Sequence, residues 1–223
     1  WEHPVHGMLG AERFLSVTED SGLIHEISDW MLETVCSDAR AWHSLLPTEM
    51  LSLWINVSGS QFNSAVIHER LRQAFVRLNH EHIDLVLEIT ENTVLEEIHR
   101  SVERLNALKE TGFRLAMDNF GKGYSSLGLL QDIPFDIIKI DMDLVHDLVA
   151  DRHAALVDAA IAMARGLGLS VVAEGVESQE QLRILKAKGC DAAQGYWLCR
   201  PLDAAALGEF LLKDATPDSD NRH

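Results

Sequence analysis

Short runs of apolar and β-branched residues alternate with longer helical patterns along this 223-residue chain. Strands are expected at 53–57, 85–90, 113–118, 137–140, 170–174 and 192–194, and helices at 28–46, 64–79, 96–110, 125–131, 144–167, 179–188 and 204–212. Repeated strand–helix units predict parallel strands joined by helical crossovers. Short, nearly all-apolar runs are typical of strands buried on both faces. The pattern therefore predicts an α/β fold.

Six such units are compatible with an open doubly wound sheet or with a β/α barrel. No G-x-G-x-x-G motif follows the first run, so the fingerprint of a dinucleotide-binding sheet is missing. A complete β/α barrel usually has eight strands and about 250 residues. The chain falls short of that, and it opens at Trp1 without an initiator methionine. We therefore expect a fragment whose first strands are absent.

The composition limits the classes of partner. Lys and Arg number 19 and Asp and Glu number 35, which gives a net charge of −16. This charge argues against a general DNA- or RNA-binding surface and against an anionic membrane surface. Three widely spaced cysteines without a C-x-x-C motif favour a reducing compartment. No apolar run approaches the roughly 20 residues of a membrane-spanning helix. We expect a cytoplasmic domain, whose parent protein can still be anchored to a membrane.

Every apolar run ends in a polar residue. The polar residues at the successive strand ends are Asn56, Glu88 with Glu91, Asp118, Lys139 with Asp141, Glu174 with Glu177, and Gln194. The carboxyl ends of the strands form the active-site face of a β/α barrel. Taken singly, each residue also fits a solvated or capping role, because strands emerge into solvent there. Their occurrence at all six strand ends favours a functional site.

The residue types at these strand ends indicate a metal site. Asn56, Glu88, Asp118 and Glu174 offer oxygen ligands, which suit Mg²⁺ or Mn²⁺ better than Zn²⁺. Carboxylates that converge on one edge repel one another unless cations neutralise them. Lys139 could hold a water molecule or stabilise a developing negative charge. The set predicts hydrolysis of a phosphoester by metal-activated water.

A glycine-rich segment, Phe120-Gly121-Lys122-Gly123-Tyr124-Ser125-Ser126, leads into one expected helix. Its backbone N–H groups could bind a phosphate. Taken alone, the segment is better explained as an ordinary turn with Ser125 as the N-cap of the helix. It lacks the spacing of a Walker A loop.

The ordered motifs at 13–14, 19–24, 56–58, 61–62, 88–91, 118–127, 135–141, 173–177, 194–196 and 200–201 resemble those of the EAL domain family. This family comprises bacterial phosphodiesterases and receptors for cyclic di-GMP. The resemblance implies a modified TIM-like β/α barrel, with the N-terminal strands missing from this chain. It implies an EAL-type domain over residues 1–213 and a polar tail over 214–223.

The resemblance also implies a mechanism and residue roles. In the family, two Mg²⁺ or Mn²⁺ ions activate water, which hydrolyses cyclic di-GMP to linear pGpG. The positions that match metal ligands are Asn56, Glu88, Asp118, Asn119 and Glu174, with Asp118 bridging both ions. Lys139 matches the lysine that contacts the attacking water, Glu174 is sometimes cast as the base, and Glu177 steadies the glycine-rich loop. Gln194 and Asp141 match ligand-binding positions.

Two departures from the family pattern predict poor hydrolysis by this polypeptide. The strand with the Glu-Ala-Leu signature, whose Glu is a metal ligand, is not in the sequence. Asn119 stands where the family usually has an Asp that binds the second metal. Both departures remove negative charge that the paired divalent ions need.

Four functions fit these observations. The leading one is an EAL-type cyclic di-GMP phosphodiesterase with impaired activity, and the second is a non-catalytic cyclic di-GMP receptor, which Asn119 favours. A different metal-dependent barrel enzyme, such as an enolase-like one, is disfavoured by the glycine-rich loop and by Gln194-Gly195-Tyr196. The last is a structural domain without a ligand. The resemblance further implies a homodimer and neighbouring sensory or GGDEF domains.

Overall fold

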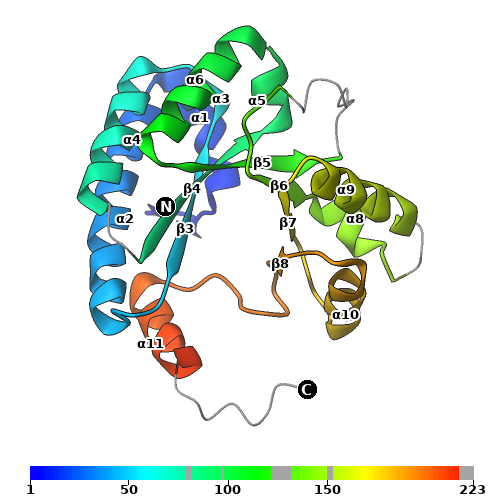
Figure 1. Ribbon diagram of the computed structural model, residues 1–223. Helices are drawn as coiled ribbons and strands as arrows, with labels where there is room; N and C mark the ends of the chain where they lie inside the picture. Colours follow the sequence, from blue (N-terminus) through cyan, green and yellow to red (C-terminus); the bar gives the residue numbers. More distant parts are fainter. Residues whose placement is uncertain (79–81, 97, 122–131, 150–152, 216–223) are drawn as a thin grey trace.

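Six parallel strands form one curled sheet, and helices cover its outer face (Figure 1). The computed structural model describes residues 1–78, 82–96, 98–121, 132–149 and 153–215. The strands are β3 (Leu51–Val57), β4 (Ile83–Thr90), β5 (Arg114–Phe120), β6 (Ile137–Ile140), β7 (Ser170–Ala173) and β8 (Ala192–Ala193). All six lie within two residues of the bounds predicted from the sequence, because a short apolar run between polar residues is a strong strand signal.

The order of the strands decides between the two predicted architectures. Neighbours in the sheet are consecutive in the chain, from β3 through β8, and every pair is parallel. A doubly wound sheet reverses its strand order at a switch point, whereas a barrel winds in one direction. The sheet is therefore a half-barrel, and the prediction of a TIM-like β/α barrel is confirmed.

Most of the expected helices are present between the strands. The bounds of the helices are α1 (Leu15–Ser21), α2 (Ile24–Leu45), α3 (Gly59–Phe62), α4 (Ala65–Leu78), α5 (Glu91–Glu96), α6 (Ile98–Thr111), α8 (Met142–His146), α9 (Ala154–Gly166), α10 (Gln179–Lys188) and α11 (Ala204–Ala215). Of these, α1, α3 and α5 were not expected, and one expected helix is divided. The single helix expected over 144–167 is wrong, because α8 ends at His146 and α9 begins at Ala154. Asp147 caps the end of α8, and an acidic residue at a helix C-terminus is unfavourable to the helix dipole. The helix expected over 125–131 lies outside the described residues.

A small N-terminal unit precedes the sheet and was not expected. It consists of an antiparallel hairpin of β1 (Glu2–His3) and β2 (Gly7–Met8), a 3-10 turn at Ala11–Arg13, and α1. Strands of two residues carry no periodicity, so the sequence pattern could not reveal them. No helix among the described residues is long and apolar enough to cross a membrane.

The main core lies between the outer face of the sheet and the helices. One cluster joins β3, β4 and β5 to α2, α4 and α6, and it includes Leu87, Ile89 and Leu115, all fully buried. A second cluster joins β6 and β7 to α8, α9 and α10. Because outward-facing residues of each strand are held in this core, the intervening residues of the same strands face the inside of the half-barrel.

The two outer strands of the sheet have one neighbour each among the described residues. β3 pairs with β4 only, and β8 pairs with β7 only. The inside of the half-barrel is therefore bordered by two strand edges.

Candidate active site

The side chains inside the half-barrel form two layers. The lower layer is apolar and consists of Val86, Ala116, Ile137 and Val172, with Trp54 packed against them. Alternate residues of a strand point to the same face, so the residue two positions later on each strand lies above this layer. The upper layer is polar and consists of Asn56, Glu88, Asp118, Lys139, Glu174 and Gln194. The strand period of two thus places the polar residues of separate strands at one level.

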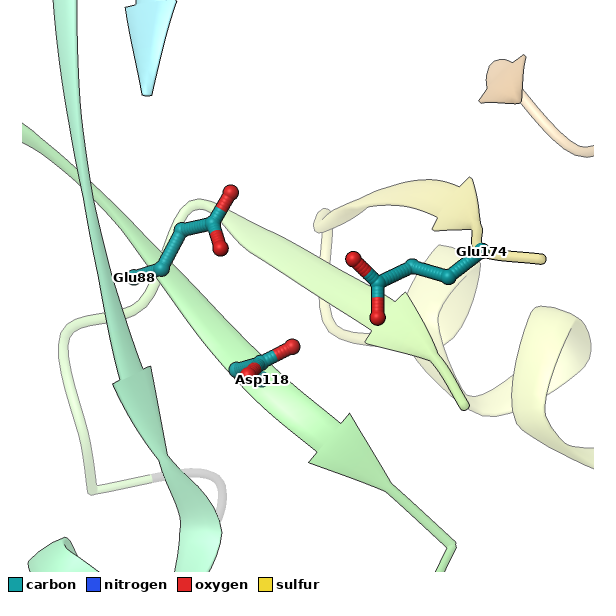
Figure 2. Close-up of side chains that lie close together, drawn as sticks. All are labelled: Glu88, Asp118 and Glu174. Carbon is teal, nitrogen blue, oxygen red and sulfur yellow. The ribbon is translucent and has the colours of Figure 1, made fainter. Parts of the chain in front are cut away.

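Three carboxylates of the upper layer converge. Oxygen atoms of Glu88, Asp118 and Glu174 lie within 4.8 Å of one another. Figure 2 shows the three side chains pointing into a common space from β4, from β5 and from the segment after β7. The Glu174 N–H donates to the Ile140 carbonyl at 3.0 Å, which fixes this segment beside β6. These three residues are called the acidic triad below.

Lys139 supplies a cation to the acidic triad. Its Nζ lies 2.7 Å from Glu88 Oε2 and 3.5 Å from Asp118 Oδ1, and it also contacts Glu174 Oε1. The lysine side chain is only 2% exposed. Burial lowers the pKa of Lys139, but its hydrogen bonds to Glu174 and Glu88 more than compensate, so the pKa lies above its ordinary value. The lysine is therefore charged at neutral pH.

The environment of Lys139 favours its charged form, whereas the environment of Glu88 disfavours its charged form. Burial raises the pKa of this carboxyl, and the charges of Asp118 and Glu174 raise it further, against the lowering effect of Lys139. A raised pKa means that the ionised carboxylate is less stable here than in water. An additional positive charge at the triad would therefore be favourable.

One oxygen of Asp118 accepts no hydrogen bond from the described residues, although it lies 3.5 Å from Lys139 Nζ. Its Oδ2 accepts a hydrogen bond from Asn119 Nδ2 at 3.0 Å, whereas its buried Oδ1 accepts none among the described residues. Buried polar atoms without a partner are uncommon. An oxygen-only ligand set with a spare buried acceptor fits Mg²⁺ or Mn²⁺, and the residues present are therefore suited to the predicted metal.

Asn119 occupies an irregular position in β5. Its φ of +58° is the only positive value at a non-glycine residue in the described part of the chain. The pairing of β5 with β6 shifts register between Met117 and Phe120, around this residue. Asn tolerates the left-handed region better than most residues. The bulge turns the Asn119 amide toward Asp118, where it acts as a donor.

A cavity of about 530 Å³ borders the triad and reaches the lower layer, where Trp54 and Val172 line it. It is lined by Trp54 and Asn56 from β3, by the triad and Lys139, and by Gln194 after β8. Its volume is in the range of sites for small organic ligands. Residues of both edge strands, β3 and β8, line the cavity. The cavity therefore spans the inside of the half-barrel.

Two other predicted site residues lie elsewhere. Asp141 is buried and accepts a hydrogen bond from the Asp143 N–H at 2.9 Å, which makes it the N-cap of α8. Glu177 is exposed, and one carboxylate oxygen lies 4.0 Å from Nδ1 of His146. Neither residue lines the cavity. The glycine-rich segment lies outside the described residues from position 122 to its end at 126.

Two residues near the site were missed by the sequence interpretation. Trp54 lines the cavity, and its ring centroid is 5.8 Å from Lys139 Nζ. It stands two positions before Asn56, so the strand period could have identified it. Gln181 is buried, accepts from the Glu177 N–H at 2.7 Å and donates to the Val145 carbonyl at 3.2 Å. Its side chain joins α10 to α8, and the capping-box pattern Ser178-x-x-Gln181 could have identified it in the sequence.

Fold and site together define a TIM-like barrel protein with an acidic centre at the carboxyl ends of its strands. The chain belongs to the EAL domain family, whose profile matches residues 1–201. It is 39% identical over 212 residues to the cyclic di-GMP phosphodiesterase NbdA of Pseudomonas aeruginosa. The aligned residues make up 95% of this chain and 27% of NbdA. It is 37% identical over 208 residues to the bifunctional diguanylate cyclase/cyclic di-GMP phosphodiesterase MucR of the same species. That alignment covers 93% of this chain and 30% of MucR. The chain thus spans about a quarter to a third of the length of these curated relatives.

Solved structures of EAL domains share the fold. The MucR phosphodiesterase in complex with cyclic di-GMP superposes with a TM-score of 0.84 at 37% identity, over 93% of this chain and 84% of that one. The EAL domain of Mycobacterium smegmatis DcpA superposes with a TM-score of 0.76 at 32% identity, over 86% and 87%. The predicted family membership is confirmed.

Proposed function

We propose that this domain binds cyclic di-GMP in the cavity of the half-barrel and hydrolyses one phosphodiester bond to give linear pGpG. The observation that carries the proposal is the acidic triad, which surrounds a buried lysine in the wall of a cavity of about 530 Å³. Relatives with 39% and 37% identity that are named as cyclic di-GMP phosphodiesterases support the choice of substrate.

The position and the exposure of each residue indicate its role in the proposed reaction. Glu88, Asp118 and Glu174 would hold Mg²⁺ or Mn²⁺, with Asn56 beside Glu88 in the pairing of β3 and β4. When bound, such an ion lowers the pKa of a coordinated water and neutralises phosphate charge. Within the triad, the Glu174 side chain is 22% exposed and the Glu88 side chain only 6%. Glu174 is therefore the carboxylate better placed to accept a proton from an attacking water.

Two further residues of the upper layer face the substrate space. Lys139 Nζ is positioned to stabilise negative charge that develops on the phosphate. Gln194 lines the cavity near its edge, and its amide offers a donor and an acceptor to the ligand. Glu177 and Asp141 act indirectly in this proposal, Glu177 on the glycine-rich segment and Asp141 through the start of α8.

A non-catalytic cyclic di-GMP receptor is the second candidate, and Asn119 is the observation that favours it. The Asn119 amide donates to Asp118 and brings no negative charge to the site. A site with less negative charge binds divalent ions more weakly. Ligand binding without turnover would be the result.

Metal-dependent product formation separates the two functions. We expect titration calorimetry to show binding of cyclic di-GMP, and chromatography of the mixture to show pGpG only when Mg²⁺ or Mn²⁺ is added. EDTA should abolish the product. Binding without any product at saturating metal would contradict the enzyme and support the receptor, and absence of binding would contradict both.

Replacing Asn119 by Asp is expected to increase Mn²⁺ affinity by about tenfold, because a second charge joins Asp118. The same change removes the amide donor to Asp118 and should lower the melting temperature in EDTA. Calorimetry with Mn²⁺ and thermal unfolding in EDTA measure the two effects. Asn106→Asp, at an exposed position of α6, adds the same charge far from the site and should change neither. Equal Mn²⁺ affinity in Asn119→Asp and wild type would contradict a metal-binding role for position 119.

We also propose that the domain forms a homodimer, works in the cytoplasm and is joined to sensory or GGDEF domains. The bifunctional relative MucR supports the last point. The family resemblance supports the dimer, and sedimentation velocity of the chain tests it.

A further inference from the structure

The ammonium group of Lys139 lies in the space that the acidic triad encloses. Its Nζ is in ion-pair contact with all three carboxylates, including the 2.7 Å contact with Glu88 Oε2. In the part of the chain that the structure describes, no other Lys, Arg or His forms an ion pair with the triad. The triad and the lysine together carry three negative charges and one positive charge, a surplus of two negative charges.

We propose that Lys139 is an internal counter-ion that holds the triad together when no divalent metal is bound. This inference shares one assumption with the proposed function, namely that the triad is the metal site. It assigns Lys139 a positioning role in the metal-free state, in addition to any contact with the substrate. The domain would then stay folded while the metal exchanges.

The surroundings of Lys139 make this role necessary. The apolar lower layer of the half-barrel lies directly below the triad, and the Trp54 ring lies 5.8 Å from Nζ on the same side. The Lys139 and Glu88 side chains are only 2% and 6% exposed, so water solvates these two charges poorly. Three like charges this close together are strongly unfavourable unless a cation is present. Lys139 is the cation that the fold itself provides.

The same geometry makes the lysine and a divalent ion competitors for the same oxygen atoms. Wild-type protein should gain less stability from Mn²⁺ than a variant without the lysine charge, because Lys139 already neutralises part of the triad. Removal of the lysine charge should make folding depend on the metal. It should also strengthen metal binding, because repulsion between the ammonium and the ion is lost.

Thermal unfolding of Lys139→Met in EDTA and in Mn²⁺ tests the proposal. The variant should melt about 10 °C lower than wild type in EDTA, and Mn²⁺ should restore most of the loss. Calorimetry should show Mn²⁺ binding about tenfold tighter than in wild type. Lys109→Met is the matched control, because Lys109 Nζ lies 2.7 Å from Asp136 Oδ1 outside the site. Its loss of stability should be the same in EDTA and in Mn²⁺.

A second variant covers the case in which Lys139→Met does not fold without metal. Adding Glu174→Gln to Lys139→Met removes one of the repelling charges, so the double variant should be more stable in EDTA than the single one. Equal stability of the two in EDTA, or a Lys139→Met variant that Mn²⁺ does not stabilise, would overturn the proposal. Neither measurement uses cyclic di-GMP. If the proposal for Lys139 failed while the wild-type protein still made pGpG, the proposed function would therefore stand.

Discussion

Asp118→Asn is expected to reduce metal-dependent formation of pGpG by about 1,000-fold or more. The substitution preserves the shape of the side chain and removes its charge. Asp118 stands between Glu88 and Glu174 in the acidic triad, and its buried Oδ1 accepts no hydrogen bond among the described residues. Asn would replace one carboxylate oxygen with an NH₂ group, which cannot bind a cation. The loss of charge and of an acceptor should weaken both metal binding and catalysis.

Rate and metal affinity should fall together in this variant. Product formation at saturating cyclic di-GMP gives the rate, and calorimetry with Mn²⁺ gives the affinity. Asp158→Asn is a suitable control, since Asp158 is exposed and pairs with Lys188 far from the cavity. It should retain activity within about twofold, because exposed ion pairs contribute little. An Asp118→Asn variant that kept wild-type Mn²⁺ affinity would contradict the assignment of the triad as the metal site.

Gly195→Ala is expected to destabilise the domain by about 3 kcal/mol and to weaken ligand binding. A Cβ atom at Gly195 would lie 2.2 Å from both the backbone N and the backbone O of Val176. Those two atoms are hydrogen bonded, N to the Gln194 carbonyl and O to the Trp197 N–H, each at 3.0 Å. Because the obstacle is backbone, the segment must move and both bonds must weaken. Gln194 would then leave its place on the cavity wall.

Urea unfolding measures the stability loss, and calorimetry with cyclic di-GMP measures the effect on the cavity. Gly208→Ala provides the same chemical change in α11, where the new Cβ would meet Leu45 and Trp42 at 3.5 Å, an ordinary contact distance. Ala is favoured over Gly inside a helix by up to about 1 kcal/mol, so this variant should be as stable as wild type or more so. If Gly195→Ala were equally well tolerated, the close approach of the two backbone segments would not matter for the site.

The sequence was sufficient to predict most of the site, and the reason is the regularity of parallel strands. Polar residues at the ends of apolar runs come to one level when the strands run in register, as Asn56 and Glu88 do. Charge and residue type then indicated a metal site with a lysine. This inference needed no long-range contact, only the strand period and the direction of the strands.

Other features depend on tertiary contacts that no local pattern reports. The Lys139 Nζ lies among all three triad carboxylates, which the sequence interpretation did not predict. The division of the 144–167 segment into α8 and α9 was missed, because the segment contains no proline, and no glycine before Gly166, to mark a break. The donor role of Asn119 depends on its φ of +58° at an irregularity in β5. These features follow from how the half-barrel closes around its inner layers.

The edge strand β3 bears on the behaviour of this polypeptide at high concentration. It has a neighbour on one side only among the described residues, and its sequence, Leu-Ser-Leu-Trp-Ile-Asn-Val, contains no charged residue, proline or glycine. Uncharged edge strands of this kind are templates for strand addition from other chains. The net charge of −16 opposes such association by keeping molecules apart. Solubility should therefore fall as salt screens that charge, and a partner that covers the free edge of β3 would protect the protein from aggregation.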